Sequence, residues 1–271
     1  MKHYLLHFVL MTLALITLIP LWLMAVASIS GATAKLGLSG LIPQWRQLNL
    51  HTYFEVWVEG HFGRYFFNSV WVSFWITLTN LLFDSMAAYA LSRREFKGRS
   101  LLMFLILVKL LIPATVLMVP TFILIKSLGI YDSYWALILP MVAETFGIFL
   151  LRQFMLGLPK ELEEAARLEG ASDIRVFFFI ILPLCRPALA VVAIHSLLVS
   201  WNSYIHPLIL TVSDSMRTLP LGIAFYRSSH SGVDTAHLMA GSMIASLPVL
   251  IAFLLFQKHI ISGLTQGAVK G

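Results

Sequence analysis

The sequence contains six stretches of about 18 to 27 residues with few or no charged side chains. A helix needs about 20 apolar residues to cross a hydrocarbon layer of about 30 Å, and each stretch is long enough for that. Backbone polar groups in lipid must be satisfied within the segment, so helices are expected. The sequence therefore predicts an all-α polytopic membrane protein. Its six transmembrane helices are expected near residues 4–30, 65–91, 100–125, 134–151, 188–212 and 236–257.

Composition excludes an ordinary soluble domain. The 271 residues are 59% hydrophobic and 12% charged, with a mean hydropathy of +0.85, whereas soluble domains are about 25% charged. The first apolar stretch is uncharged from His3 to Ala34. Because the apolar region of a signal peptide has about 7–15 residues, this stretch is interpreted as a retained helix.

The distribution of basic residues predicts the orientation. With the N-terminus inside, the cytoplasmic segments receive 12 Lys and Arg and the external segments receive 6. Basic residues accumulate in cytoplasmic loops, so both termini are expected in the cytoplasm. The same bias explains most of the net charge of +6, and no nucleic-acid partner is predicted. The single cysteine, Cys185, excludes an internal disulfide and a cysteine-based metal cluster.

The predicted cytoplasmic loop at 158–187 has the pattern of two short helices. Pro159 suits a first helical turn, three glutamates follow at the positive N-terminal end, and Gly170 suits a left-handed stop. Ser172 can cap a second helix, which Pro183 and Pro187 are expected to end.

This loop has the composition of an interface. Ala165 and Ala166 allow another backbone to approach closely, and the acidic side chains give the first helix a negative charge. Phe177 and Phe178 can hold the second helix against the membrane helices. Composition alone leaves an alternative open, in which the loop is amphipathic and rests on lipid headgroups.

The residues of this loop resemble the EAA loop of ABC importer permeases. The matching pattern is Glu164-Ala165-Ala166, Glu169-Gly170-Ala171, Phe177, Ile180, Leu182-Pro183 and Pro187. Glu169 departs from the more usual aspartate and keeps its charge. The resemblance extends over residues 64–271. The segments Asn68-Ser69, Trp201-Asn202 and Gly263-Leu264-Thr265-Gln266-Gly267 are similar to the carbohydrate-uptake branch, and the ending resembles the smaller permease subunit of maltose-type and glycerol-phosphate-type importers.

The resemblance implies a type I ABC importer permease. Its expected parts are an N-terminal helix and external loop (1–63), a permease core (64–262) and a cytoplasmic tail (263–271). The expected partners are a second permease subunit, two ATP-binding subunits, an extracytoplasmic solute-binding protein and the lipid bilayer of a prokaryotic cell membrane. A sugar or sugar-like solute would move by alternating access. The chain lacks a phosphate-binding loop motif. We therefore expect a non-catalytic subunit without a cofactor, with ATP and Mg²⁺ on the partner ATPase.

The resemblance also implies which residues couple transport to ATP. Glu164 would contact the ATPase, Ala165 and Ala166 would let the helix seat, and Gly170 would set the turn, so Gly170→Asp is expected to uncouple transport. The complete expected coupling set is Glu164, Ala165, Ala166, Glu169, Gly170, Ala171, Phe177 and Pro183.

Three ionisable residues, Asp84, Lys109 and Glu144, lie within predicted spans, where such groups are costly and usually functional or paired. Asp84 and Lys109 lie at similar depths and can form an ion pair between adjacent helices; a polar lining of the solute path is the alternative. Glu144, with Trp201, Asn202 and Tyr204, is a candidate for the translocation path; an aromatic interface belt is the alternative for the last three. An ion-coupled secondary carrier using the three charges is the alternative function. His3 and His7 have helical spacing but no nearby third ligand, so no metal site is predicted.

Overall fold

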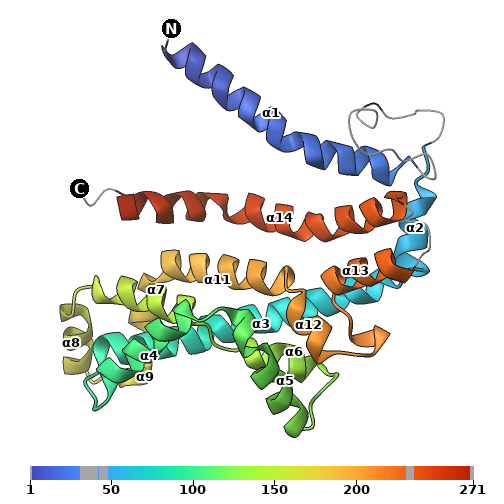
Figure 1. The fold of residues 1–271 in the computed structure, drawn as a ribbon. Coiled ribbons are helices and arrows are strands. Elements are labelled where there is room, and N and C mark those ends of the chain that lie inside the picture. Colours follow the sequence, from blue (N-terminus) through green and yellow to red (C-terminus); the bar gives the residue numbers. More distant parts are fainter. Residues whose placement is uncertain (1, 31–41, 43–47, 230–234, 269–271) are drawn as a thin grey trace. The chain divides into compact units, whose positions relative to one another are not determined.

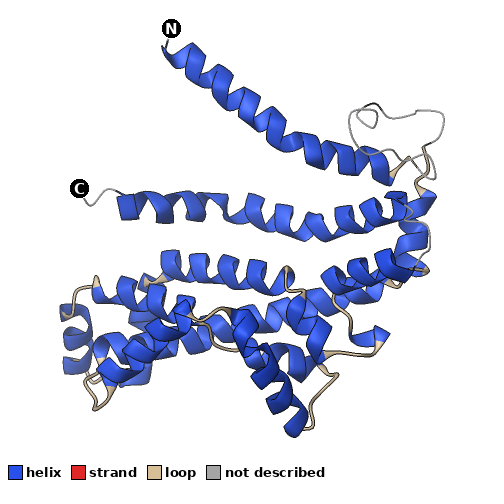
Figure 2. Ribbon diagram, viewed as in Figure 1, coloured by secondary structure: helices blue, strands red, loops and turns tan. Residues whose placement is uncertain are grey.

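The computed structural model describes residues 2–30, 42, 48–229 and 235–268. The described residues form helices joined by short turns, and no strand occurs among them (Figure 2). Four helices are long and apolar enough to cross a membrane, and the number is up to six if each of two bent helix pairs counts as one span. The all-α fold predicted from the sequence is confirmed.

The chain divides into two compact units. The first comprises Met1–Phe67 and Thr218–Leu250, and the second comprises Asn68–Arg217 and Ile251–Gly271. α3 (Phe62–Arg93) and α14 (Thr235–Ala268) each contribute residues to both units. Residues 263–268 of the expected tail continue α14.

The first unit is built around the start of α3. It also holds α1 (Lys2–Ser28), α2 (His51–Val58), α13 (Leu219–Ser229) and the first part of α14 (Figure 1). A Cβ at Gly222 would lie 2.2 Å from the Tyr65 ring, and a Cβ at Gly241 would lie 2.4 Å from the Phe62 ring. Glycine at these two positions lets α13 and α14 approach α3 closely. Glu55 of α2 contacts His237 of α14 at 2.8 Å.

The second unit contains most of the apolar helices and the short helices of the segment 158–187. Its elements after α3 are α4 (Arg99–Leu111), η4 (Ala114–Leu117), α5 (Met118–Ser127), α6 (Tyr134–Ile138), η5 (Leu139–Met141), α7 (Thr145–Leu156), α8 (Glu161–Leu168), α9 (Asp173–Val176), η6 (Phe177–Ile181), α10 (Leu182–Leu184), α11 (Arg186–Trp201), α12 (Ile205–Leu210) and η7 (Asp214–Met216).

Three of the expected spans are interrupted. The third bends by 103° between Arg99–Leu111 and Ala114–Ser127, because Pro113 forces Ile112 into an extended conformation. The fourth is interrupted at η5 and then runs on to Leu156, beyond the expected end at 151. The fifth was expected over 188–212, but α11 ends at Trp201, where the side-chain amide of Asn202 (Nδ2) donates to the Leu198 carbonyl at 2.9 Å.

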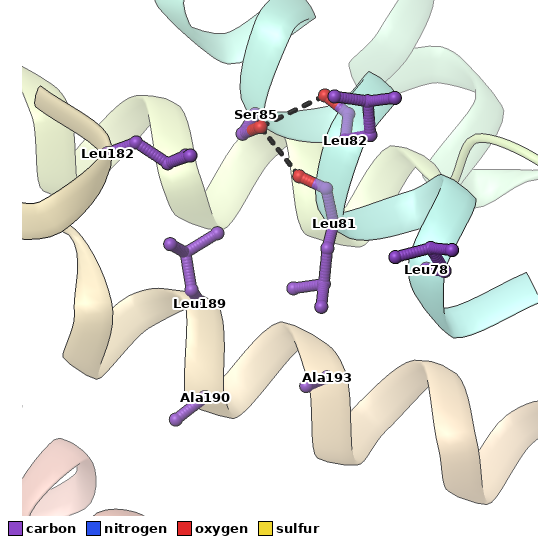
Figure 3. Close-up of a pocket in the computed structure, with 8 residues that line it drawn as sticks. All are labelled: Leu78, Leu81, Leu82, Ser85, Leu182, Leu189, Ala190 and Ala193. Carbon is purple, nitrogen blue, oxygen red and sulfur yellow. Dashed lines mark hydrogen bonds between the residues drawn. The ribbon is translucent and has the colours of Figure 1, made fainter. Parts of the chain in front are cut away.

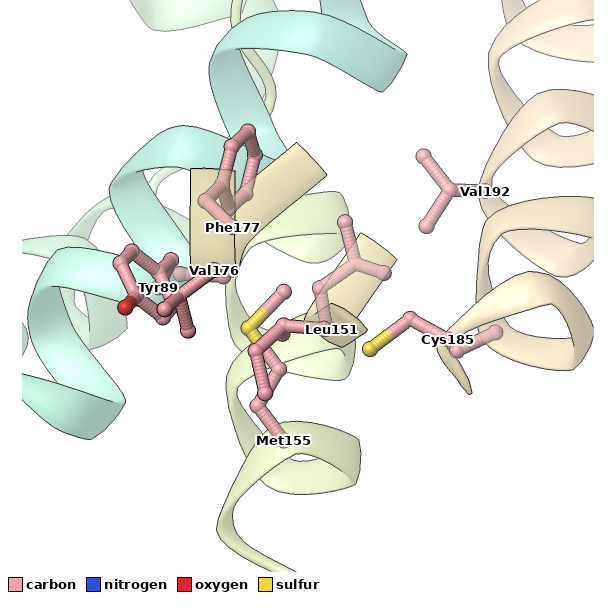
Figure 4. Close-up of a cluster of buried hydrophobic side chains, with 10 residues drawn as sticks. Tyr89, Leu151, Met155, Val176, Phe177, Cys185 and Val192 are labelled. Atoms are coloured by element: carbon pink, nitrogen blue, oxygen red, sulfur yellow. The ribbon is translucent and has the colours of Figure 1, made fainter. Parts of the chain in front are cut away.

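A buried apolar cluster joins α3, α7 and the segment from α9 to α11. Tyr89, Leu151, Phe177, Cys185 and Val192 are among its members (Figure 4). The Tyr89 and Phe177 rings lie 5.2 Å apart. The segment after α8 is thus packed onto the membrane helices through its apolar side chains.

Candidate coupling site

The segment 158–187 forms the two short helices that the sequence predicts. α8 spans Glu161–Leu168 and carries three glutamates in its first turn. Gly170 has φ +86°, the left-handed conformation that glycine adopts at little cost. Ser172 caps α9 by accepting a hydrogen bond from the Arg175 amide. The helix–turn–helix prediction is confirmed.

Both proline predictions in this segment need correction. Pro159 precedes α8, whose N-cap is Lys160, so it does not lie in the first turn. Pro183 and Pro187 do not end the second helix: Pro183 lies in α10 and Pro187 in the first turn of α11. Proline is tolerated at a first helical turn because its missing N–H has no partner there. The chain therefore remains helical and bends by 81° between Asp173–Leu184 and Arg186–Trp201.

The inner face of α8 is held by a buried ion pair. Glu163 Oε1 lies 3.0 Å from Nε of Arg93 in the last turn of α3, and the two side chains are 4% and 3% exposed. The other oxygen, Oε2, accepts from Arg167 at 2.9 Å and from the Tyr89 hydroxyl at 3.4 Å. Both carboxylate oxygens are thus engaged within the chain.

Arg93 also binds the end of α7. Its Nη2 donates to the carbonyl oxygens of Met155 at 2.5 Å and Leu158 at 2.8 Å. These carbonyls lie where α7 ends at Leu156, and the last carbonyls of a helix lack intrahelical partners. One guanidinium therefore joins the C-terminal ends of α3 and α7 to the first turn of α8.

The outer face of α8 is exposed and mixed in character. Glu164, Ala165 and Glu169 are exposed, and Leu168 is 91% exposed. Leu162 of α8 and Ile174 of α9 are exposed as well. Apolar side chains exposed beside acidic ones are typical of a surface that another protein covers.

A second set of charged residues links the end of α3 to α9 on the exposed side of this site. Arg94 pairs with Asp173, and Arg167 Nε lies 3.5 Å from the same carboxylate. The hydrogen bond from Arg94 is the main reason why the pKa of Asp173 lies below its usual range. Since Asp173 is 58% exposed, this pair contributes little to stability.

The aromatic residues of the second helix divide between core and surface. Phe177 is buried, as expected, whereas Phe178 and Phe179 are exposed. Ala166 and Ala171 are partly buried against the core cluster. Of the expected coupling set, Glu164, Ala165, Glu169 and Gly170 are therefore the exposed members. Ala166, Ala171 and Phe177 have a packing role.

The predicted ion pair between Asp84 and Lys109 is absent from the described residues. Asp84 is fully buried, whereas Lys109 is exposed. Asp84 Oδ1 accepts from the Glu144 amide at 2.8 Å, at the N-cap of α7. A Cβ at Gly147 would lie 2.1 Å from Oδ2. Asp84 thus supports the start of α7, where the positive end of the helix favours a carboxylate.

Glu144 pairs with a histidine that the sequence analysis did not select. Its Oε2 lies 3.1 Å from Nδ1 of His195 on α11, and both side chains are about one-third exposed. The His195 ring packs on Phe146 at 4.3 Å between centroids. An intramembrane histidine is itself a signal for such a site.

Of the other three expected path residues, two line an open cavity. Asn202 and Tyr204 border a volume of about 350 Å³ with Thr115 and His206. Trp201 is buried. Glu144 contacts His195, which lies about two helical turns before Trp201 on α11. The four expected path residues therefore do not line one common cavity.

Two further cavities are apolar. One of about 420 Å³ lies between α3 and α11, where the Ser85 hydroxyl donates to the carbonyls of Leu81 and Leu82 (Figure 3). The other, of about 670 Å³, is lined by aromatic residues such as Trp71, Trp75 and Tyr134. No group of three or more His, Cys, Asp or Glu able to hold a metal ion occurs in the described part of the chain.

The comparisons with known proteins agree with this architecture. Residues 80–266 match the family of binding-protein-dependent transport system inner membrane components. The arabinooligosaccharides transport system permease protein AraQ of Halalkalibacterium halodurans is 40% identical over 96% of this chain and 93% of its own length. The trehalose/maltose transport system permease protein MalG of Thermococcus litoralis is 40% identical over 78% of this chain and 77% of its own length.

A solved structure has the same fold. It is a chain of a bacterial ABC transporter involved in the import of the acidic polysaccharide alginate, with a TM-score of 0.82, 24% identity and 95% coverage of both chains.

The chain belongs to the family of binding-protein-dependent transport system inner membrane components. It is a membrane-spanning permease of the ABC importer class, and the resemblance found in the sequence is confirmed.

Proposed function

We propose that this chain is the sugar-importing permease subunit of an ATP-driven importer, and that the exposed face of α8 docks on an ATP-binding subunit. The observation that supports this most strongly is the exposure of Leu168 beside Glu164 on a helix whose opposite face is buried in the chain. A helix resting on lipid headgroups would carry basic residues. Here the first turn of α8 is acidic, which favours a basic groove on a protein.

The complete importer has a second permease subunit, two ATP-binding subunits and an extracytoplasmic solute-binding protein. ATP and Mg²⁺ lie on the ATP-binding subunits, and this chain contributes no catalytic residue. The importer lies in a prokaryotic cell membrane, with both termini of this chain in the cytoplasm. The excess of basic residues in that set of loops supports this orientation.

Docking is tested by affinity purification of the tagged chain from detergent-solubilised membranes. The test variant is Glu164→Lys with Gly170→Asp. The matched control is Glu95→Lys with Gly98→Asp, because Glu95 is exposed and Gly98 also has positive φ (+91°) with open space around it. The Arg94–Asp173 pair places both loops on one side of the unit.

We expect the wild type and the control to recover an ATP-binding subunit and a second permease, and the test variant to lose the ATP-binding subunit alone. Equal recovery in all three would refute docking through α8. A chain that purifies alone and transports in liposomes would instead support the ion-coupled carrier, for which the comparisons provide no support.

The polar cluster within the spans favours a neutral solute. Glu144 and His195 are each about one-third exposed, so Glu144 presents a carboxylate that a solute can reach, and Asp84 is buried behind it against the Glu144 amide. A carboxylate accepts hydrogen bonds from sugar hydroxyls but repels a uronate. Relatives named for arabinooligosaccharides and for trehalose and maltose are consistent with this class. We place Glu144, Asn202 and Tyr204 along the path.

Proteoliposomes holding the co-purified complex test the solute class. Arabinotriose, maltose, trehalose and diacetylchitobiose are compared with trigalacturonate. We expect uptake of at least one neutral sugar, a fall of about tenfold with Glu144→Gln and no uptake of trigalacturonate. Preferred uptake of trigalacturonate, or full uptake of neutral sugars by Glu144→Gln, would refute the solute assignment and leave the docking result unaffected.

A further inference from the structure

We propose that Arg93 and Glu163 are positioning residues that make α8 move as one body with the end of α3, so that force received at α8 reaches the membrane helices. The proposal rests on the proposed function. It assigns a role to residues that lie outside the expected docking set.

The first support is the number of elements that Arg93 joins. Its Nε faces Glu163 of α8 at 3.0 Å, and its Nη2 donates to carbonyls at the end of α7. A planar guanidinium presents several donors in a fixed geometry. These contacts therefore hold the end of α3, the end of α7 and the first turn of α8 in one arrangement. A lysine could not reproduce that arrangement.

The second support is burial. Glu163 and Arg93 are almost completely buried, whereas Glu164, the next residue, is exposed. Charge pairs away from water are screened little by salt, and removing one partner leaves an uncompensated buried charge. The first turn of α8 thus separates two functions. Glu164 faces outward to a partner, and Glu163 faces inward to α3.

The third support is the position of this pair in the force path. α3 spans Phe62–Arg93, 32 residues, or about 48 Å at 1.5 Å per residue. Its last turn carries the ion pair, and its carbonyl groups at Leu91 and Ser92 are further bound by Arg99 and Arg152. A displacement of α8 is therefore applied to the end of a helix long enough to cross the membrane, the rigid-body motion that alternating access requires.

The experiment compares transport with ATP hydrolysis in proteoliposomes of the co-purified complex. The probe is arabinotriose, or the member of the neutral panel that the wild type accumulates. Glu163→Gln alone would remove the buried charge partner of Arg93. The main variant is therefore Arg93→Gln with Glu163→Gln, in which two amides can hydrogen-bond without a buried charge. Arg94→Gln is the control, since Arg94 pairs with the exposed Asp173.

We expect the double variant to retain the ATP-binding subunit and hydrolyse ATP within twofold of the wild type, while sugar imported per ATP falls at least tenfold. Arg94→Gln should stay within twofold in both measurements. A merely structural role would lower assembly, hydrolysis and transport in proportion, and that result would overturn the proposal, as would a double variant with the wild-type ratio.

A separate outcome identifies failure of the proposed function. If the wild type contains no ATP-binding subunit, or imports no member of the panel, the importer or sugar assignment fails before the variants are compared. The two results are therefore distinguishable.

Discussion

The second unit contains two polar clusters, which differ in the charges of their members and in the function that we propose for each. The α8 cluster comprises Arg93, Glu163 and Arg167, two cations and one anion in contact. The membrane cluster comprises Asp84, Glu144 and His195, with two carboxylates and one imidazole.

We interpret the difference as a separation of the proposed force transmission from the proposed solute contact. In the α8 cluster, each oxygen of Glu163 lies within 3.0 Å of an arginine nitrogen, and the carboxylate is 4% exposed. In the membrane cluster, Asp84 is buried against the Glu144 amide, whereas the Glu144 side chain is about one-third exposed. A buried network of charged groups rigidifies its surroundings, whereas a partly exposed carboxylate can accept hydrogen bonds from hydroxyl groups.

The largest effect on stability is expected from Gly147→Ala. The added Cβ would lie 2.1 Å from Asp84 Oδ2 and 3.2 Å from the Val192 side chain. Because Asp84 is fully buried and bound to the Glu144 amide, it cannot move away cheaply. We expect a loss of about 3 kcal/mol, measured by thermal unfolding in detergent. Adding Asp84→Ala should make the double variant less than additive; strict additivity would show that the two residues do not touch.

Asp84→Ala alone is expected to cost about 2 kcal/mol, because the Glu144 amide loses its buried acceptor. Lys109→Met should not restore this loss, since Lys109 is exposed and forms no ion pair with Asp84 in the described structure. Thermal unfolding of the single and double variants measures both effects. Rescue by Lys109→Met would reinstate the ion pair that the sequence predicted.

Gly170→Ala is expected to cost about 1 kcal/mol, because a side chain is strained at φ +86°. Nothing lies within 4 Å of the added Cβ, so no clash adds to this value. Gly170→Asn, which tolerates the left-handed conformation better, should lose less. A loss well above that of Gly98→Ala, measured by the same unfolding assay, would mean that the turn is crowded within the chain.

The smallest effect is expected at Asp173. Its pKa is lowered by Arg94, so its contribution is present at pH values above the unfolded value of about 3.9 and is lost as the pH falls through the lower folded value. Because the pair is exposed, Asp173→Asn should cost about 0.5 kcal/mol or less at pH 7. Unfolding measured from pH 3 to pH 8 should show the difference between wild type and variant disappearing at the acid end. A constant difference would exclude the carboxylate as its source.

The sequence predicted those features that local rules determine. The apolar spans, the two short helices of the segment 158–187, the left-handed Gly170 and the cap at Ser172 follow from hydrophobic length, glycine and capping rules. The sequence did not predict which glutamate of α8 is buried, because Glu163 and Glu164 are chemically identical neighbours. Glu163 is buried because it contacts Arg93 at the end of α3, about 70 residues earlier in the sequence.

The misplaced ion pair has a similar cause. Asp84 and Lys109 have matching depths, but depth does not determine which helix face points inward. Lys109 lies on the exposed face of α4. Asp84 instead accepts a hydrogen bond from the backbone amide of Glu144, where the fourth span is interrupted. Sequence patterns do not encode such contacts. Pro140 marked that interruption without indicating what would bind there.

Cysteine cross-linking in native membranes can show whether the outer face of α8 meets an ATP-binding subunit, because the one native cysteine, Cys185, is buried. Leu168 on α8 is 91% exposed and is replaced by cysteine, and Phe179 on η6, which is 76% exposed, is replaced as the control. With a linker that reacts with lysine and cysteine, we expect Leu168→Cys to give a cross-linked product that contains an ATP-binding subunit and Phe179→Cys to give none. Cross-linking from Phe179→Cys alone, or from neither site, would show that α8 does not dock in this way.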